Sequence, residues 1–147
     1  MAAQNRECAL CGASLAKTVP KSQTWCNPCR AKARVRNVEA SAYRFLQYKM
    51  DLAKKRAKRR ELTFGLDMET LYEVFKAQDG KCALTGLPMT WKTDEDMSLS
   101  IDRIDPLKGY DRDNVRLVCT RINIMRSDLP DKDFYWWCKV CASANAD

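Results

Sequence analysis

Apolar side chains recur at helical spacing over residues 30–61, a segment without glycine or proline. Its apolar stripe follows three- and four-residue steps and consists of Val35, Val38, Ala42, Phe45 and Leu52. Lys49 interrupts the stripe. The pattern predicts one long helix, which could pair with a second copy as a homodimer through this stripe.

The same reasoning predicts four further elements and a turn. Asp67 can cap a helix over 68–78, with Leu71, Val74 and Phe75 on one face. Segment 81–89 is predicted as a strand and turn and 93–97 as a polar loop. Strands follow at about 98–104 and 115–119.

Two helices close the chain. One is predicted over about 120–128, and the last opens at Pro130 or Asp131. The last helix contains Phe134, Trp137 and Val140, so we expect Trp136 and Trp137 to lie in the core rather than to stack on bases.

The chain contains eight cysteines, and their positions help to divide it into three segments. Cys8 and Cys11 form one C-x-x-C pair, and Cys26 and Cys29 form another, a spacing typical of a tetrahedral zinc site. We therefore predict a four-cysteine zinc knuckle over 1–30, in which the zinc is structural because four thiolates leave no open position. A long basic helix and linker would follow over 31–65, ending at Thr63–Gly65, and an α+β domain over 66–147.

Charge is divided unevenly along the 147 residues. Residues 1–65 contain 15 Lys/Arg and 4 Asp/Glu, which gives this half a net charge of +11. Residues 66–147 contain 11 Lys/Arg and 15 Asp/Glu, which gives a net charge of −4. The densest run is Lys54, Lys55, Arg56, Lys58, Arg59 and Arg60. A basic half suggests a polyanion partner, and we expect this run, together with Arg126, to contact nucleic acid.

Composition also indicates the cellular compartment in which we expect the protein. No run of 18 apolar residues is present, and the first seven residues have no apolar signal region. Cysteines in such a chain favour metal binding over disulfides, so we expect a reducing cytoplasm and no membrane partner.

Residues 98–123 contain the most specific motif. Asp102 ends the first strand, Asn114 lies in Asp113–Asn114–Val115, and Asn123 lies in the following helix. This order of strand, turn, strand and helix resembles the ββα-metal core of the HNH, or His-Me finger, endonucleases, particularly the phage endonuclease VII type. The resemblance covers about residues 67–141. It implies that Asp102 and Asn123 hold a catalytic Mg²⁺ or Mn²⁺, and that Asn114 ties down the loop.

The chain departs from that family at its catalytic histidine. Arg103 stands in the histidine position, and the sequence contains no histidine. A guanidinium stays protonated and cannot act as a general base, although it can bind phosphate. Three alternatives follow: metal-bound hydroxide attacks without a side-chain base, Asp105 or Tyr110 serves as base, or the site only binds DNA.

The zinc site of that family is also altered, because Thr85 and Ile122 stand where two cysteines are expected. Four other cysteines could close a second zinc site if the last helix folds back: Cys82, Cys119, Cys138 and Cys141. The alternative is that they are small buried apolar residues.

Three functions remain. The leading prediction is a metal-dependent DNA endonuclease, phage-encoded by resemblance and acting in the host cytoplasm. The first alternative is an inactive nucleic-acid-binding or regulatory protein that keeps the fold. The second is a zinc-stabilised adaptor whose basic helix binds an acidic protein.

Overall fold

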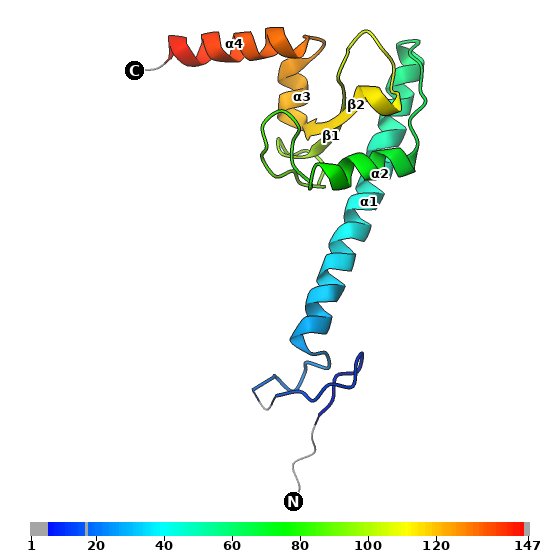
Figure 1. The fold of residues 1–147 in the computed structure, drawn as a ribbon, viewed down its shortest axis with the longest axis vertical. Helices are drawn as coiled ribbons and strands as arrows, with labels where there is room; N and C mark the ends of the chain where they lie inside the picture. Colours follow the sequence, from blue (N-terminus) through cyan, green and yellow to red (C-terminus); the bar gives the residue numbers. More distant parts are fainter. Residues whose placement is uncertain (1–5, 17, 146–147) are drawn as a thin grey trace, which may run out of the picture. The chain divides into compact units, whose positions relative to one another are not determined.

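The computed structural model describes residues 6–16 and 18–145. Its elements are listed in chain order, with their labels in Figure 1: α1 (Asn27–Arg59), α2 (Met68–Ala77), β1 (Leu99–Arg103), η1 (Arg112–Asn114), β2 (Val115–Cys119), α3 (Thr120–Arg126) and α4 (Asp131–Ala144). With one exception, each predicted helix and strand is present, and its ends lie within three residues of the prediction. The exception is the segment after α2, which forms a single bridge, between Lys81 and Pro88, in place of the predicted strand.

The chain forms two compact units, Met1–Ser41 and Ala42–Asp147, so the boundary falls inside α1. This differs from the predicted break at Thr63–Gly65. That segment is ordered instead: Phe64 pairs with Tyr110, and the Tyr110 amide donates to the Thr63 carbonyl at 3.0 Å. Gly109 permits this approach, because a Cβ there would overlap the Thr63 backbone.

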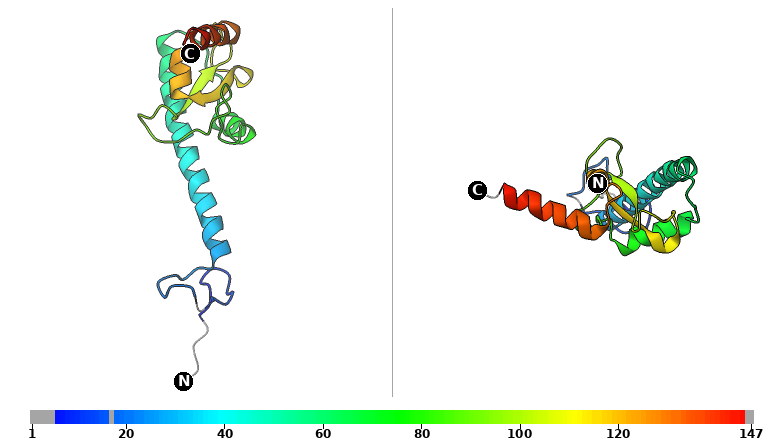
Figure 2. Two further views of the ribbon diagram at one scale, coloured as in Figure 1. Left: turned by 90° about the vertical axis from the view of Figure 1, so that its left-hand side faces the viewer. Right: turned by 90° about the horizontal axis from the view of Figure 1, so that it is seen from above.

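The second unit is built on a two-stranded antiparallel ribbon. Leu99 pairs with Cys119 and Arg103 with Val115, and all five residues of β1 are buried. α3 follows β2 directly, and the C-terminal half of α1 packs against the ribbon (Figures 1 and 2). α2 begins at the predicted cap, since the Thr70 amide donates to the Asp67 carboxylate at 2.7 Å.

The buried face of α1 overlaps the predicted apolar stripe only in part, because Ala42 is buried and Phe45 and Leu52 are half-buried. Val35 and Val38 are about half exposed, whereas the buried side chains of α1 are Ala42, Leu46, Ala53 and Ala57. Three of these four are alanines, and Ala53 and Ala57 belong to the same core as the ribbon residues Ile101 and Leu117. Local hydrophobicity therefore identified the helix and part of its buried face, but not the small residues of that face.

α4 runs outward from the ribbon and packs on it through its first turn, where Phe134 is buried (Figure 1). The expectation that Trp136 and Trp137 lie in the core is wrong, because their side chains are 56% and 52% exposed. Within the described residues, none of the helices is long and apolar enough to span a membrane.

Candidate functional site

The four N-terminal cysteines come together as the spacing predicts. The sulfur atoms of Cys8, Cys11, Cys26 and Cys29 all lie within 4.8 Å of one another. The Cys26 amide donates to the Cys8 sulfur at 3.2 Å and is the main reason that the pKa of this thiol falls to about 6. Hydrogen bonds with Cys26 and Cys11, in that order, raise the pKa of the Cys29 thiol to about 12. A cluster in which the thiols compete for charge fits a tetrahedral zinc ion, which binds all four as thiolates.

The second set of cysteines is not assembled. Among the described residues, Cys8, Cys11, Cys26 and Cys29 are the one group with metal-binding geometry. Cys82 and Cys119 are buried side by side in the core, where burial raises the pKa of Cys119 to about 11. Cys138 and Cys141 lie on the outward-running α4 and do not join them. The core pair thus follows the predicted alternative of small buried residues.

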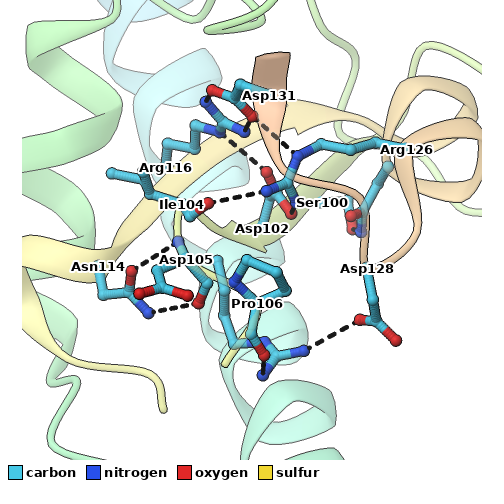
Figure 3. Close-up of polar contacts among 12 residues, drawn as sticks. Ser100, Asp102, Ile104, Asp105, Pro106, Asn114, Arg116, Arg126, Asp128 and Asp131 are labelled. Atoms are coloured by element: carbon cyan, nitrogen blue, oxygen red, sulfur yellow. Dashed lines mark hydrogen bonds and ion pairs between the residues drawn. The ribbon is translucent and has the colours of Figure 1, made fainter. Parts of the chain in front are cut away.

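Asp102 lies at the predicted place near the end of β1, but two arginines hold its carboxylate (Figure 3). Arg116 donates from Nε to Oδ2 at 2.8 Å, and Arg126 donates from Nη1 to Oδ1 at 2.9 Å. Asp131, the first residue of α4, accepts from both arginines and completes a ring of four residues. We call this the arginine–aspartate cluster; it has two positive and two negative charges.

Two members of the arginine–aspartate cluster are nearly removed from solvent, whereas the Asp131 side chain is 33% exposed. Asp102 is 4% exposed and Arg126 is 1% exposed, with a further bond from Arg126 Nη2 to the Ile104 carbonyl at 2.8 Å. Arg126 therefore cannot contact nucleic acid, and that expectation is wrong. Hydrogen bonding from Arg116 is the largest influence on Asp131 and lowers the pKa of its carboxyl.

The donor set at Asp102 does not fit the catalytic metal that the resemblance implies. Mg²⁺ needs free oxygen ligands and room for several waters. Both oxygens of Asp102 instead accept charge-assisted bonds from guanidinium groups. Each guanidinium would also repel an added cation, by about 4 kcal/mol per pair of unit charges at 4 Å near a protein surface, and so offset the attraction of the two carboxylates.

Arg103, in the family's histidine position, holds the loop that joins the strands. Its Nη1 donates to the carbonyls of Pro106 and Lys108 at 2.7 and 3.0 Å, and its Nη2 contacts Asp128 at 3.3 Å. With 8% of its surface exposed, it is mainly a loop anchor and not a free phosphate ligand. Asp105 and Tyr110, the alternative bases, lie in or beside this loop, and Tyr110 is buried.

Asn114 ties down the same loop, as the family resemblance implies (Figure 3). Its Oδ1 accepts from the Asp105 amide at 2.8 Å, and its Nδ2 donates to the carbonyls of Asp105 and Gly109. Asn123 points its Nδ2 to the Ser100 hydroxyl at 2.7 Å, and its Oδ1 accepts no hydrogen bond from the described residues.

Five of the six cations at the end of α1 are exposed, and Arg56 is half-buried. The inner side of this part of α1 faces β1 and α3 across a cavity of about 430 Å³. Its α1 wall includes Lys49, Lys55, Arg56 and Arg59, and its other wall includes Ser100, Thr120 and Asn123. We call these residues the cationic seam; its lining contains no acidic residue within the described part of the chain.

A second cavity, of about 310 Å³, shares Arg56 and Asn123 with the seam and extends to Asp128. Asp128 there contacts Arg60 at 3.4 Å and Arg103 at 3.3 Å, so this cavity already contains an anion. Of the four cations of the seam, Lys49 is the one that the sequence did not assign to a site, and Ser100 and Thr120 were not assigned either. The sequence feature that could have identified Lys49 is its charge, which interrupts an otherwise apolar stripe.

The fold and this site define a small mixed α/β protein with a four-cysteine cluster that could bind zinc. No protein-family model matches the chain, and no curated protein matches it. Among solved structures the chain is similar to the rare-cutting HNH restriction endonuclease PacI, with 16% sequence identity, 94% of each chain covered and a TM-score of 0.47. A likeness of this degree assigns no role to individual residues.

Proposed function

We propose that this chain is a nucleic-acid-binding protein whose partner is DNA. It keeps an HNH-like ββα arrangement but does not carry out metal-dependent cleavage. The observation that supports binding is the cationic seam, where four positive side chains of α1 face β1 and α3 with no acidic neighbour in the cavity. Neutralisation of backbone phosphates by Lys and Arg supplies most sequence-independent affinity for nucleic acid.

The arginine–aspartate cluster supports the second half of this proposal. An endonuclease of the HNH type would need the Asp102 carboxylate for its metal ion and a base in place of Arg103. In this chain, Asp102 is bonded to Arg116 and Arg126, and Arg103 anchors a loop. Both residues thus serve the fold.

The endonuclease remains the second candidate because of Asn114 and Asn123. Asn114 makes the loop bonds that the family resemblance implies, and the Oδ1 of Asn123, beside the cations of the seam, accepts no hydrogen bond from the described residues. The contacts of these two amides are compatible with the roles that the resemblance implies, whereas Asp102 and Arg103 are engaged in structural bonds.

Binding is tested by measuring fluorescence anisotropy of labelled duplex DNA over a range of salt concentrations. Neutral substitutions at the six cations of 54–60 should weaken binding to all sequences and flatten the salt slope by about 0.9 per lost contact. Changing Lys132 and Lys139 of α4 to Gln is the control and should have little effect. Unchanged affinity and slope in the six-residue variant would overturn the proposal.

Cleavage is tested separately on supercoiled and branched DNA with Mg²⁺ or Mn²⁺. We expect none from the wild-type chain, and no increase in its melting temperature with either ion. Cleavage that disappears in Asn123→Ala would replace our proposal with the endonuclease. Arg103→His restores the family's base but removes two loop bonds, so its folding must be checked alongside.

A further inference from the structure

We propose that the cationic seam is a phosphate-binding site, in which Lys49 and Arg56 of α1 hold one backbone phosphate of a nucleic acid against the β1–α3 face. This inference rests on the proposed function and goes beyond it, because it locates a half-buried contact apart from the exposed cations of 54–60. A phosphate group could also come from a free nucleotide, and the experiment below separates the two sources.

The first argument is the charge balance of the cavity. Lys49, Lys55, Arg56 and Arg59 line it, and none of them forms an ion pair with a described acidic residue. Burial, followed by the charge of Arg56, lowers the pKa of Lys49, while the charge of Asp94 offsets this in part. Folding has therefore brought like charges together, and an anion between them would relieve the repulsion.

The second argument is an unused hydrogen-bond donor. The Nε of Arg56 is buried and has no partner within the described part of the chain. Buried polar groups are normally paired, so this N–H needs an acceptor. A guanidinium matches phosphate oxygens with two parallel N–H donors, whereas the Lys49 ammonium, which lies 5.1 Å from the centre of the Phe45 ring, supplies a compact charge.

The opposite wall is suited to the same ligand. Ser100 is 6% exposed, and its oxygen accepts from Asn123 Nδ2 at 2.7 Å, which leaves the hydroxyl hydrogen to donate. This wall contributes no carboxylate. In the adjoining cavity, by contrast, Asp128 already supplies an anion to Arg60 and Arg103. Of the two cavities, the seam is the one that lacks a counter-charge.

The test compares Lys49→Gln with Lys58→Gln, an equal change of charge on the exposed side of the same helix. A charge-assisted hydrogen bond to phosphate predicts that Lys49→Gln and Arg56→Gln each weaken DNA binding by about 10-fold or more. Lys58→Gln should have a much smaller effect. Lys49→Arg, which keeps the charge, should restore part of the affinity.

A second measurement excludes a merely structural role for Lys49. Because its charge is unfavourable in the free protein, Lys49→Gln should melt at the same temperature as wild type or higher, although it binds DNA less well. By NMR, the pKa of the Lys49 ammonium should rise when DNA is added. A lower melting temperature combined with an unchanged Lys49 pKa on DNA would overturn the inference.

The remaining outcomes separate the inference from the proposed function. Equal losses in Lys49→Gln and Lys58→Gln would overturn the phosphate site and leave nucleic-acid binding in place. Wild-type protein that binds no DNA would overturn the proposed function. If adenosine monophosphate or inorganic phosphate then still raised the Lys49 pKa, the phosphate site would stand with a free nucleotide or phosphate as its ligand.

Discussion

At the residue scale, the arginine–aspartate cluster determines what Asp102 can do. Its carboxylate bonds to Arg116 and Arg126, which lie 14 and 24 residues further along the chain. A buried carboxylate held by two guanidiniums is a structural group, since both its oxygens are occupied and its charge is balanced. The same atoms that a metal ion would need therefore stabilise the contacts of β1 with β2 and α3.

The first prediction concerns Arg126. Changing Arg126 to Ala leaves Asp102 and Asp131 with Arg116 as their one guanidinium partner within the cluster. Breaking a buried pair in this way should lower the free energy of unfolding by about 3–5 kcal/mol, measured by urea denaturation. The control is Arg121→Ala, whose pair with Asp96 is more than half exposed on both sides and should be worth about 0–1 kcal/mol. Equal losses in the two variants would contradict the cluster's role.

Some of these residue roles were predictable from sequence and others were not. The role of Asn114 followed from the family resemblance, and its bonds join residues five to nine positions apart, within the motif that carries that resemblance. The partners of Asp102 come from β2 and the end of α3, and no local pattern marks an arginine as buried rather than exposed. For this reason Arg126 was predicted to contact nucleic acid, as were the cations of 54–60.

At the scale of elements, helix and strand positions were predictable because caps, turns and side-chain spacing act over a few residues. The buried face of α1 was predictable only in part, because it depends on the ribbon that packs against it. Ala53 and Ala57 are fully buried there, whereas the larger Phe45 and Leu52 of the predicted stripe are half-buried. The fit of small side chains in a close-packed core, and not hydrophobicity alone, selects this face.

The second prediction follows from this packing. Ala53 has no exposed surface, so Ala53→Leu would insert three extra carbon atoms between α1 and its neighbours. Overpacking should lower the free energy of unfolding by about 1–3 kcal/mol, measured by thermal or urea denaturation. Lys54→Leu, next to it on the exposed side, should change the stability by about 0.5 kcal/mol or less. A neutral Ala53→Leu would mean that α1 does not pack closely at this point.

At the scale of the whole molecule, the two units have different sources of stability. The second unit has an extended apolar core that includes Leu46, Leu71, Ile101 and Leu117. In the described part of the first unit, Cys8 and Leu15 are the buried apolar residues. A segment of about 40 residues with so small a core usually needs a metal or disulfides to fold. The predicted homodimer through α1 stays a prediction.

The last prediction therefore concerns zinc. Purified protein should contain one zinc per chain, and Cys26→Ala with Cys29→Ala should remove it, because two thiolates leave the tetrahedral site half empty. Loss of the ion removes the folding energy of the first unit, so limited proteolysis should then cut within residues 1–41 and spare the second unit. Cys138→Ala with Cys141→Ala is the matched control and should keep both the zinc and the protease resistance, since these cysteines lie outside the cluster. Elemental analysis and mass spectrometry of the fragments measure both effects. Unchanged zinc content in the first variant would refute the assignment, and cleavage throughout the chain would show that the second unit also depends on the ion.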